Sequence, residues 1–365
     1  MNVPTDVEMN QRDQIPMTTS ALNRLRKENA ARWPNIAAAE SLSREKMATL
    51  KGVVSDLLPT DEGSLVVLGS LARGEFTVDS DLDWMILIDS RADSRHLEIV
   101  HALKLGLEKA GFKVPGPTEV FGGLVFSHEL VHAIGGDEDT NKNMTRRLLL
   151  LLESAAIDAP GSKEVHARVI SGILNRYVEE DASFVNANKR SDKIPRFLLN
   201  DVVRFWRTMA VDYVNKYRAR AGNKWALRNI KLRMSRKLLF ISGFHMCISW
   251  ALKAQHDEQF VVPKLVSHLR DWTQRSPLES LANVVEQYAA PLTDDIFDSY
   301  DSFLLLLNDE NKRKILEKLS PEEAYTNDVF LEARVVANKF NDALTRLLFE
   351  SNGDITRLTK KYGVF

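Results

Sequence analysis

The stretch SLVVLGSLARGEFTVDSDLDWMILI, residues 64 to 88, decides the fold. Its apolar run from Leu65 to Leu68 predicts a short buried strand. This strand should end at Gly69 and Ser70, because a small residue lets the backbone turn sharply. A second apolar run, from Trp84 to Ile88, predicts another strand. The sequence therefore indicates two strands joined by a glycine turn and a polar stretch.

Two acidic residues, Asp81 and Asp83, open the second predicted strand. On an extended backbone, residues two apart point to the same face, so their carboxylates should lie side by side near the glycine turn. Neighbouring carboxylates repel each other unless a cation lies between them, and hard oxygen ligands suit Mg²⁺. We therefore predict that Asp81 and Asp83 are catalytic metal ligands for Mg²⁺, with Mn²⁺ as an alternative. The backbone N–H groups of Gly69 and the hydroxyl of Ser70 should hold nucleotide phosphates.

This spacing resembles the signature of the polymerase-β-type nucleotidyltransferase superfamily. Within it, the stretch is most similar to the bacterial branch that contains the PII-protein uridylyltransferases and their uncharacterised relatives. The matching residues are Gly69, Ser70, Arg73, Gly74, Glu75, Ser80, Asp81 and Asp83. The resemblance implies an α+β fold, with a small mixed sheet flanked by helices and an all-helical domain after it. It also implies transfer of a nucleoside monophosphate from a nucleoside triphosphate to an acceptor, with release of pyrophosphate.

The same resemblance suggests roles for further residues near the turn. Arg73 and Ser80 are candidates for nucleotide binding, and Arg73 should pair with Glu75 to brace the turn. The superfamily places a third acidic ligand on a later strand. Glu119 is our candidate for this third catalytic acid, with Glu129 as the alternative, although an exposed glutamate at a strand edge explains Glu119 equally well.

The composition sets broad limits on the kind of protein. The 365 residues suffice for two domains with a sizeable core, and 44% of them are hydrophobic. A formal net charge of −1 argues against a protein that binds nucleic acid through bulk charge, so any basic surface must be local. The single cysteine, Cys247, excludes an internal disulfide and a zinc site built mainly from cysteines. No apolar run approaches the roughly 20 residues of a membrane span, so we expect no membrane partner and a cytoplasmic location.

The sequence suggests three parts. Residues 1–19 form a predicted mobile tail, residues 20–159 the catalytic domain, and residues 160–365 a helical bundle. We place the boundary at Pro160 and Gly161, because the sequence before it predicts both strands and helices, whereas the sequence after it predicts almost only helices.

A basic stripe runs from Lys216 to Lys237, and no acid occurs between Asp212 and Asp257. Its cations are Lys216, Arg218, Arg220, Lys224, Arg228, Lys231, Arg233, Arg236 and Lys237. Lys224, Arg228 and Lys231 share one helical face, and we predict that they bind the nucleotide triphosphate. Arg233, Arg236 and Lys237 should lie on another face of the helix. A docking surface for RNA and a merely solvated helix are the alternatives for the stripe.

Two further stretches each allow a functional and a purely structural interpretation. HELVH, from His128 to His132, matches the HExxH pattern of zinc proteases, but Gly135 and Gly136 should end such a helix too early. We therefore favour packing or substrate contact. The segment after it should begin a leucine-rich helix near Thr140. By resemblance Asp137, Asp139, Thr145 or Arg147 could approach the nucleotide, and a capped helix with an exposed acidic turn is the alternative.

The acceptor stays open at this stage. A protein tyrosine, an RNA 3′ end, a small molecule and a second nucleotide all fit the sequence. A catalytically silent protein that senses a nucleotide with the same fold is the second hypothesis. The paired carboxylates of Asp81 and Asp83 argue against it, since a sensor has little need of them.

Overall fold

The computed structural model describes residues 20–26, 31–54, 57–58, 63–113, 120–158, 164–179, 181, 184, 192–219, 224–253, 261–351 and 353–363. The side chains of residues 216–219 are not among those described. The predicted tail at 1–19 and the predicted boundary at Pro160 and Gly161 lie outside these ranges.

The core of the N-terminal part is a four-stranded mixed sheet with the strand order β3-β2-β1-β4. Its strands are β1 (Gly63–Leu68), β2 (Asp83–Ile88), β3 (Leu124–Phe126) and β4 (Ser154–Ile157). Strand β1 pairs antiparallel with both β2 and β4, whereas β2 pairs in parallel with β3. The α+β class and the small mixed sheet predicted from the sequence are therefore confirmed. The register sets Leu68 opposite Asp83, so the end of β1 that leads into Gly69 meets the start of β2.

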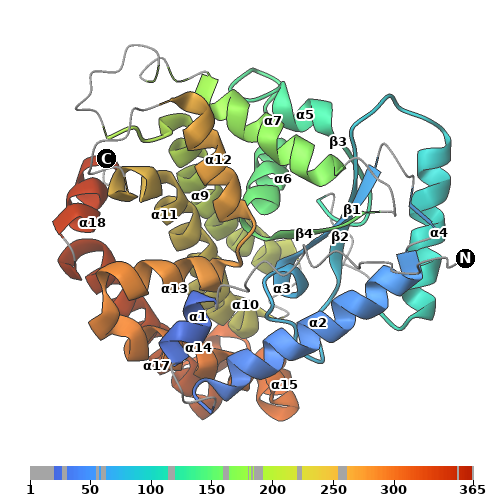
Figure 1. Cartoon of the computed structure of the whole chain (residues 1–365). Helices are drawn as coiled ribbons and strands as arrows, with labels where there is room; N and C mark the ends of the chain where they lie inside the picture. The colour runs from blue at the N-terminus through green and yellow to red at the C-terminus, as the bar shows by residue number, and fades with distance from the viewer. Residues whose placement is uncertain are drawn as a thin grey trace, which may run out of the picture.

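Both faces of this sheet are covered, which explains why its central strands are continuous apolar runs rather than alternating ones. Leu65 and Val67 of β1 belong to a hydrophobic cluster with α2 (Pro34–Val54) and α4 (Arg95–Lys109). Val66 and Leu68 belong to a second, larger cluster on the opposite face. Figure 1 shows α4 and α2 on the outer side of the sheet and α6 and α7 on the other.

The larger cluster continues from the sheet into the helical part of the chain. Its first helices are α5 (Ser127–Val131), α6 (Asn141–Leu152) and α7 (Val165–Glu179). Thr140 caps α6, as predicted, because its side chain accepts a hydrogen bond from the Asn143 backbone N–H at 3.2 Å. The two predicted domains thus pack against each other through a shared hydrophobic cluster.

The helices that follow fill the left-hand side of Figure 1. They are α9 (Arg196–Ala219), α10 (Trp225–Lys231), the π-helix η1 (Leu232–Arg236), α11 (Lys237–Lys253), α12 (Val262–Thr273), α13 (Pro277–Tyr288), the 3₁₀ turn η2 (Ala290–Leu292), α14 (Thr293–Asn308), α15 (Glu310–Lys318), α16 (Pro321–Ala324), α17 (Asp328–Arg346), the π-helix η3 (Leu347–Ser351), α18 (Gly353–Leu358) and the π-helix η4 (Thr359–Gly363). None of the helices in the described ranges is long and apolar enough to cross a membrane.

The N-terminal helix α1 (Ala21–Arg26) and the start of α2 pack on the last third of the chain. The Ala21 backbone N–H donates to the Glu279 carboxylate of α13 at 2.6 Å. The Trp33 indole N–H donates to Asp298 of α14 at 2.8 Å. These contacts hold the first helices between the sheet and the helical part, where they act as packing elements.

Strand β4 and a division within the α14–α15 segment are two of the differences from the sequence prediction. Strand β4 was not expected, because SAAI is short, contains weakly β-prone alanines and directly follows a leucine-rich helix. The apolar periodicity of residues 293–318 predicts one helix, but the structure divides this stretch at Asp309. The Asp309 side chain accepts hydrogen bonds from the backbone N–H groups of Asn311 and Lys312, both at 3.0 Å, and so begins a new helix there.

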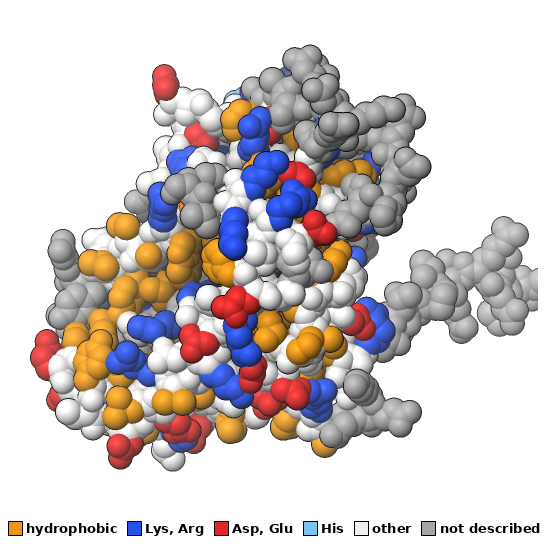
Figure 2. All heavy atoms as spheres, turned by 90° about the vertical axis from the view of Figure 1, so that its left-hand side faces the viewer, with side chains coloured by type: hydrophobic (Ala, Val, Ile, Leu, Met, Phe, Trp, Pro, Cys, Tyr) orange, Lys and Arg blue, Asp and Glu red, His pale blue; other side chains and the backbone are white. Residues whose placement is uncertain are grey.

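The charged surface is mixed rather than uniformly basic. On the face shown in Figure 2, Lys and Arg side chains gather near the top, and acidic and basic side chains are interspersed lower down. A group of hydrophobic side chains lies at the left of the same view. This distribution fits the near-zero net charge of the chain.

Candidate active site

Gly69 forms the turn between β1 and the four-residue helix α3 (Gly69–Ala72). Its φ is +67°, in the left-handed region that favours glycine. A Cβ atom at this position would lie 2.8 Å from Asp83 Oδ2, closer than Cβ atoms come to other atoms in proteins. Only glycine therefore lets the turn pass directly beside the Asp83 carboxylate.

Asp83 is the first residue of β2 and is half-buried, whereas Asp81 is exposed just before the strand. Burial raises the pKa of Asp83 to about 6. The Arg236 guanidinium opposes this rise, and the negative charges of Glu153 and Asp81 add to it. The carboxylates of Asp81 and Asp83 thus repel each other at the glycine turn, and this site favours a cation.

The residues present fit Mg²⁺ bound in its usual manner. Mg²⁺ is commonly held by one or two carboxylates together with substrate phosphates, rather than by a cage of protein ligands. Asp81 and Asp83 supply two such carboxylates beside an open turn. Over the described ranges, no group of three or more His, Cys, Asp and Glu side chains is arranged to hold a metal.

The candidates for a third acid are not brought to this pair by the described structure. Glu119 lies outside the described residues, which stop at Lys113 and resume at Val120. Glu129 is exposed on α5, on the turn that also carries His128 and His132. The two histidine rings are exposed and lie 4.8 Å apart, on a helix that ends at Val131. This single turn does not provide the two-turn helix that a zinc protease requires.

The two serines of the motif differ in their surroundings. Ser70 is half-buried, and its hydroxyl makes no hydrogen bond with the described residues, so it can donate to a ligand. Ser80 instead accepts a hydrogen bond from the Thr77 backbone N–H at 3.0 Å. Arg313 of α15 holds the same loop by donating to Thr77 Oγ1 at 3.2 Å and to the Asp79 carbonyl at 2.7 Å. Ser80 therefore shapes the loop that leads into Asp81.

Arg73 is buried at the centre of an ionic cluster behind the turn. Its Nε donates to Glu75 at 2.9 Å, which confirms the predicted pair. Its Nη1 contacts Glu153, and the Tyr300 hydroxyl donates to Glu75 at 2.8 Å. Burial alone would lower the pKa of Arg73, but the two carboxylates raise it above its usual value. The guanidinium thus braces the turn from inside.

Glu153 connects this cluster to the helical part. It is the residue between α6 and β4, and it is 3% exposed. One carboxylate oxygen contacts Arg73, and the other accepts from Arg236 Nη1 at 3.3 Å. Sequence reasoning missed Glu153 and Tyr300, because nothing in a leucine-rich run or in a distant helix marks them as neighbours of Arg73.

The basic stripe divides into residues that face the acidic pair and residues that do not. Burial lowers the pKa of Lys231 to about 8, and the cations Arg313 and Arg236 act in the same direction. The Asp81 carboxylate instead raises the pKa of Lys231, so Lys231 lies within electrostatic reach of Asp81. Arg236 reaches Glu153 and acts on Asp83. Lys231 and Arg236 are therefore two described cations of the stripe that interact electrostatically with the acidic pair.

The remaining cations of the stripe have other surroundings. Lys224 is exposed, and its Nζ lies 3.4 Å from Glu317 of α15. Arg228 is half-buried on α10, one turn before Lys231. Arg233 donates to Asn229 at 3.0 Å, and Lys237 contacts Asn341 of α17. The side chains of Lys216, Arg218 and Arg220 lie outside those described.

The π-helix η1 explains why Arg236 faces the same site as Lys231. Around a regular α-helix, residues five apart are offset by about 140°, which is why the sequence pattern assigned Arg236 to another face. Residues Leu232–Arg236 instead form a π-helix, whose hydrogen bonds join residues five apart and bring them toward the same side. Arg236 therefore lies on the same side as Lys231, and not on the separate helical face that the sequence predicted.

Arg147, a possible nucleotide ligand by resemblance, is enclosed away from the turn. It is fully buried, and its Nη1 and Nη2 each lie 2.7 Å from Asp139. Asp201 and Tyr177 complete its surroundings at 3.1 Å and 3.0 Å. The sequence-based alternative is a capped helix with an exposed acidic turn. The structure has the capped helix, and Asp137 is exposed, but the Asp139 side chain is buried in the ion pair with Arg147.

Comparison with known proteins agrees with this geometry. A search of curated protein sequences finds no significant match. A family model described as "Nucleotidyltransferase domain" matches residues 47–114. The match spans the glycine turn, the loop and the acidic pair. Over residues 47–114, the chain is thus similar to nucleotidyltransferase domains.

Proposed function

We propose that the protein is a Mg²⁺-dependent nucleotidyltransferase that moves a nucleoside monophosphate from a nucleoside triphosphate to an acceptor and releases pyrophosphate. The observation that carries the proposal is the meeting of opposite charges at the turn. Asp83 lies beside Gly69 and within electrostatic reach of Asp81, while Arg236 acts on Asp83 and Lys231 on Asp81 from the helical part. This arrangement supplies both a metal site and cations for the phosphates.

The residues at the turn would position the triphosphate. The absence of a side chain on Gly69 leaves the backbone open to close approach by a phosphate. The Ser70 hydroxyl can donate to a phosphate oxygen, and Lys231 can neutralise the charge that moves to the leaving pyrophosphate. Arg236, held by Glu153, would keep its charge fixed near Asp83.

The transfer itself is a displacement at the α-phosphorus. When bound, Mg²⁺ neutralises phosphate charge and polarises the α-phosphate for attack. The acceptor oxygen forms the new bond to phosphorus, the bond to the bridging oxygen breaks, and pyrophosphate leaves. A carboxylate near the attacking oxygen takes the acceptor proton. Glu119 stays our sequence-based candidate for that acid.

The test is label transfer from each α-labelled triphosphate, with Mg²⁺ and cell extract as the source of acceptors. Asp81→Asn and Asp83→Asn should each reduce transfer on the order of 1000-fold, because each removes a metal ligand worth several kcal/mol. The matched control is Asp93→Asn, an exposed acid paired with Arg95, which should retain transfer. Thermal unfolding of Asp83→Asn should occur at or above the wild-type temperature, because the neutral amide removes repulsion.

Two outcomes would contradict the proposal. The first is transfer by the Asp83→Asn variant within about twofold of wild type. The second is nucleotide binding without transfer to any acceptor, which would support the silent sensor instead.

A further inference from the structure

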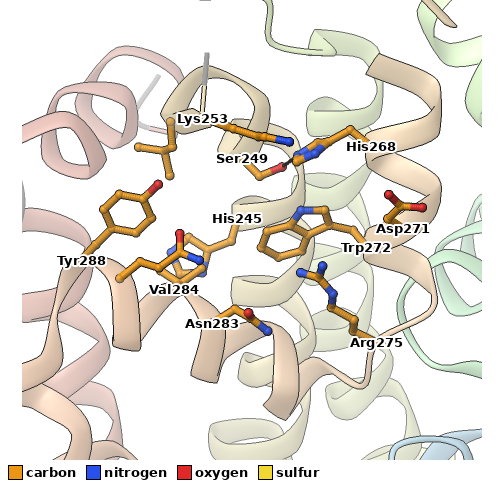
Figure 3. A pocket seen from close by; sticks show the side chains of 12 residues that line it. His245, Ser249, Lys253, His268, Asp271, Trp272, Arg275, Asn283, Val284 and Tyr288 are labelled. Carbon is orange, nitrogen blue, oxygen red and sulfur yellow. Dashed lines mark hydrogen bonds between the residues drawn. The ribbon is translucent and has the colours of Figure 1, made fainter. Parts of the chain in front are cut away.

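A cavity of about 280 Å³ lies among α11, α12 and α13, apart from the residues of the glycine turn. Figure 3 shows side chains from these helices converging on it. Its floor and walls include His245, Ser249, Trp272 and Val284. A volume near the lower end of ordinary ligand pockets suits one small molecule.

His245 is the unusual group in this cavity. The residue is 1% exposed, and both of its ring nitrogens are buried without a hydrogen-bond partner among the described residues. Buried polar atoms in proteins are nearly always paired, because an unpaired one forfeits its hydration. A neutral imidazole offers one donor and one acceptor, so a ligand that matched both would satisfy this side chain.

The neighbouring polar groups add acceptors. The Ser249 hydroxyl donates to the Met246 carbonyl at 2.8 Å, and so must accept from His268 Nε2 at 2.7 Å. This assignment leaves His268 Nδ1 as an unprotonated acceptor. The Asn283 amide nitrogen donates to the Glu279 carbonyl at 2.9 Å, which leaves the Asn283 side-chain oxygen as a second acceptor. The cavity therefore suits a ligand with several N–H donors and at least one acceptor.

The wall and the rim indicate the shape and charge of such a ligand. Trp272 presents its ring to the cavity, and Arg275 lies 5.9 Å from that ring. Aromatic walls favour flat ring systems. The exposed rim carries two cations, Lys253 and Arg275, against one acid, Asp271. A flat ligand with an anionic end matches this arrangement.

We propose that this cavity binds a nucleoside monophosphate, with its base between Trp272 and His245 and its phosphate at Lys253 and Arg275. A nucleobase combines a flat ring with N–H donors and ring acceptors on one edge. This proposed binding site is separate from the glycine turn. His245 lies nine residues after Arg236 along the continuous η1–α11 segment, or about 14 Å at 1.5 Å per residue.

The experiment uses the full chain carrying both Asp81→Asn and Asp83→Asn, without Mg²⁺, so that the catalytic site contributes as little as possible. AMP, GMP, CMP and UMP are titrated separately by isothermal calorimetry, and the imidazole resonances of His245 are followed by NMR. At least one of the four should bind at a single site and shift those resonances. His245→Leu and Arg275→Ala should each weaken binding about tenfold or more. Arg270→Ala, at a cation of α12 that does not line the cavity, should change the affinity less than about twofold.

A second variant keeps the result interpretable. Val284→Trp should fill the cavity and abolish binding, while retained helical circular dichroism confirms that the chain is folded. The proposal is overturned if none of the four monophosphates binds at millimolar concentration. It is also overturned if binding persists unchanged in both His245→Leu and Val284→Trp. Neither result bears on nucleotidyl transfer, which the label-transfer experiment tests separately.

Discussion

Arg73 and Arg147 have nearly the same chemical neighbours in two parts of the molecule. Each guanidinium is buried, contacts two carboxylates and has a tyrosine hydroxyl within its cluster. Around Arg147 the charges are enclosed among α6, α7, α9 and the turn that holds Asp139. The Arg73 cluster instead borders an acidic pair with which no cation of the described residues forms an ion pair, although Lys231 and Arg236 act on it electrostatically.

The charged groups next to the Arg73 cluster distinguish it from the Arg147 cluster. Next to Arg73, burial and like charges raise the pKa of Asp83 to about 6, and burial and nearby cations lower that of Lys231 to about 8. Opposite charges at one site, each held away from its ordinary pKa, are typical of a site that awaits a ligand. A buried arginine cluster therefore does not identify a functional site by its composition. What identifies the site is the pair of oppositely charged groups beside it, Asp83 and Lys231, whose pKa values both depart from their ordinary values.

The largest effect on stability should come from Arg147. Arg147→Met leaves the buried carboxylates of Asp139 and Asp201 without their cation, which should lower the free energy of unfolding by about 3–5 kcal/mol. Urea unfolding measures this loss. Adding Asp139→Asn and Asp201→Asn should recover part of it. A loss below about 1 kcal/mol in the single variant would show that the cluster is not the structural element inferred here.

A matched pair of lysines tests which face of the basic stripe meets the nucleotide. Lys231→Met should reduce kcat/KM for the triphosphate about 100-fold, because a fixed cation near the phosphates is lost. Lys224→Met should change it less than about twofold, since Lys224 pairs with Glu317 on α15. Steady-state label transfer gives both values. Equal losses in the two variants would instead favour a diffuse basic docking surface.

The pH dependence of kcat/KM should report the charge of Lys231. In the free enzyme its pKa is about 8, so the ammonium is lost as the pH rises through 8. We therefore expect kcat/KM to fall above that pH. Lys231→Arg keeps its charge throughout, because arginine stays protonated at all these pH values, and should move the decline to higher pH. An unchanged profile in the arginine variant would assign the decline to another group.

The smallest effect concerns the orphaned imidazole of His245. Burial lowers its pKa to about 4, compared with about 6.5 in an unfolded chain. The unfolded chain thus binds more protons between these values, and the stability due to this group falls as the pH drops from 6.5 toward 4. His245→Leu should make unfolding less sensitive to pH in that range. At pH 8 it should add about 1 kcal/mol of stability, because two unpaired buried nitrogens are removed. Denaturation series at several pH values decide this, and a variant that is less stable at pH 8 would contradict it.

The sequence by itself determined the local part of the site. The two strands, the glycine turn, the neighbouring acids and the Arg73–Glu75 pair follow from residues at most two positions apart or from uninterrupted apolar runs. Such patterns are local because strand periodicity and glycine's access to positive φ act within a few residues. The helices of the second half could be predicted for the same reason.

Only the tertiary structure decided which distant groups complete the site. Glu153 reaches Arg73 across 80 residues, and Tyr300 reaches Glu75 across 225. The π-helix η1 turned Arg236 toward Glu153, against the face expected of a regular α-helix. These positions depend on how the sheet packs against the helices, and no spacing in the sequence records the result of that packing. The acidic pair could therefore be found from sequence, while the charges that surround it could not.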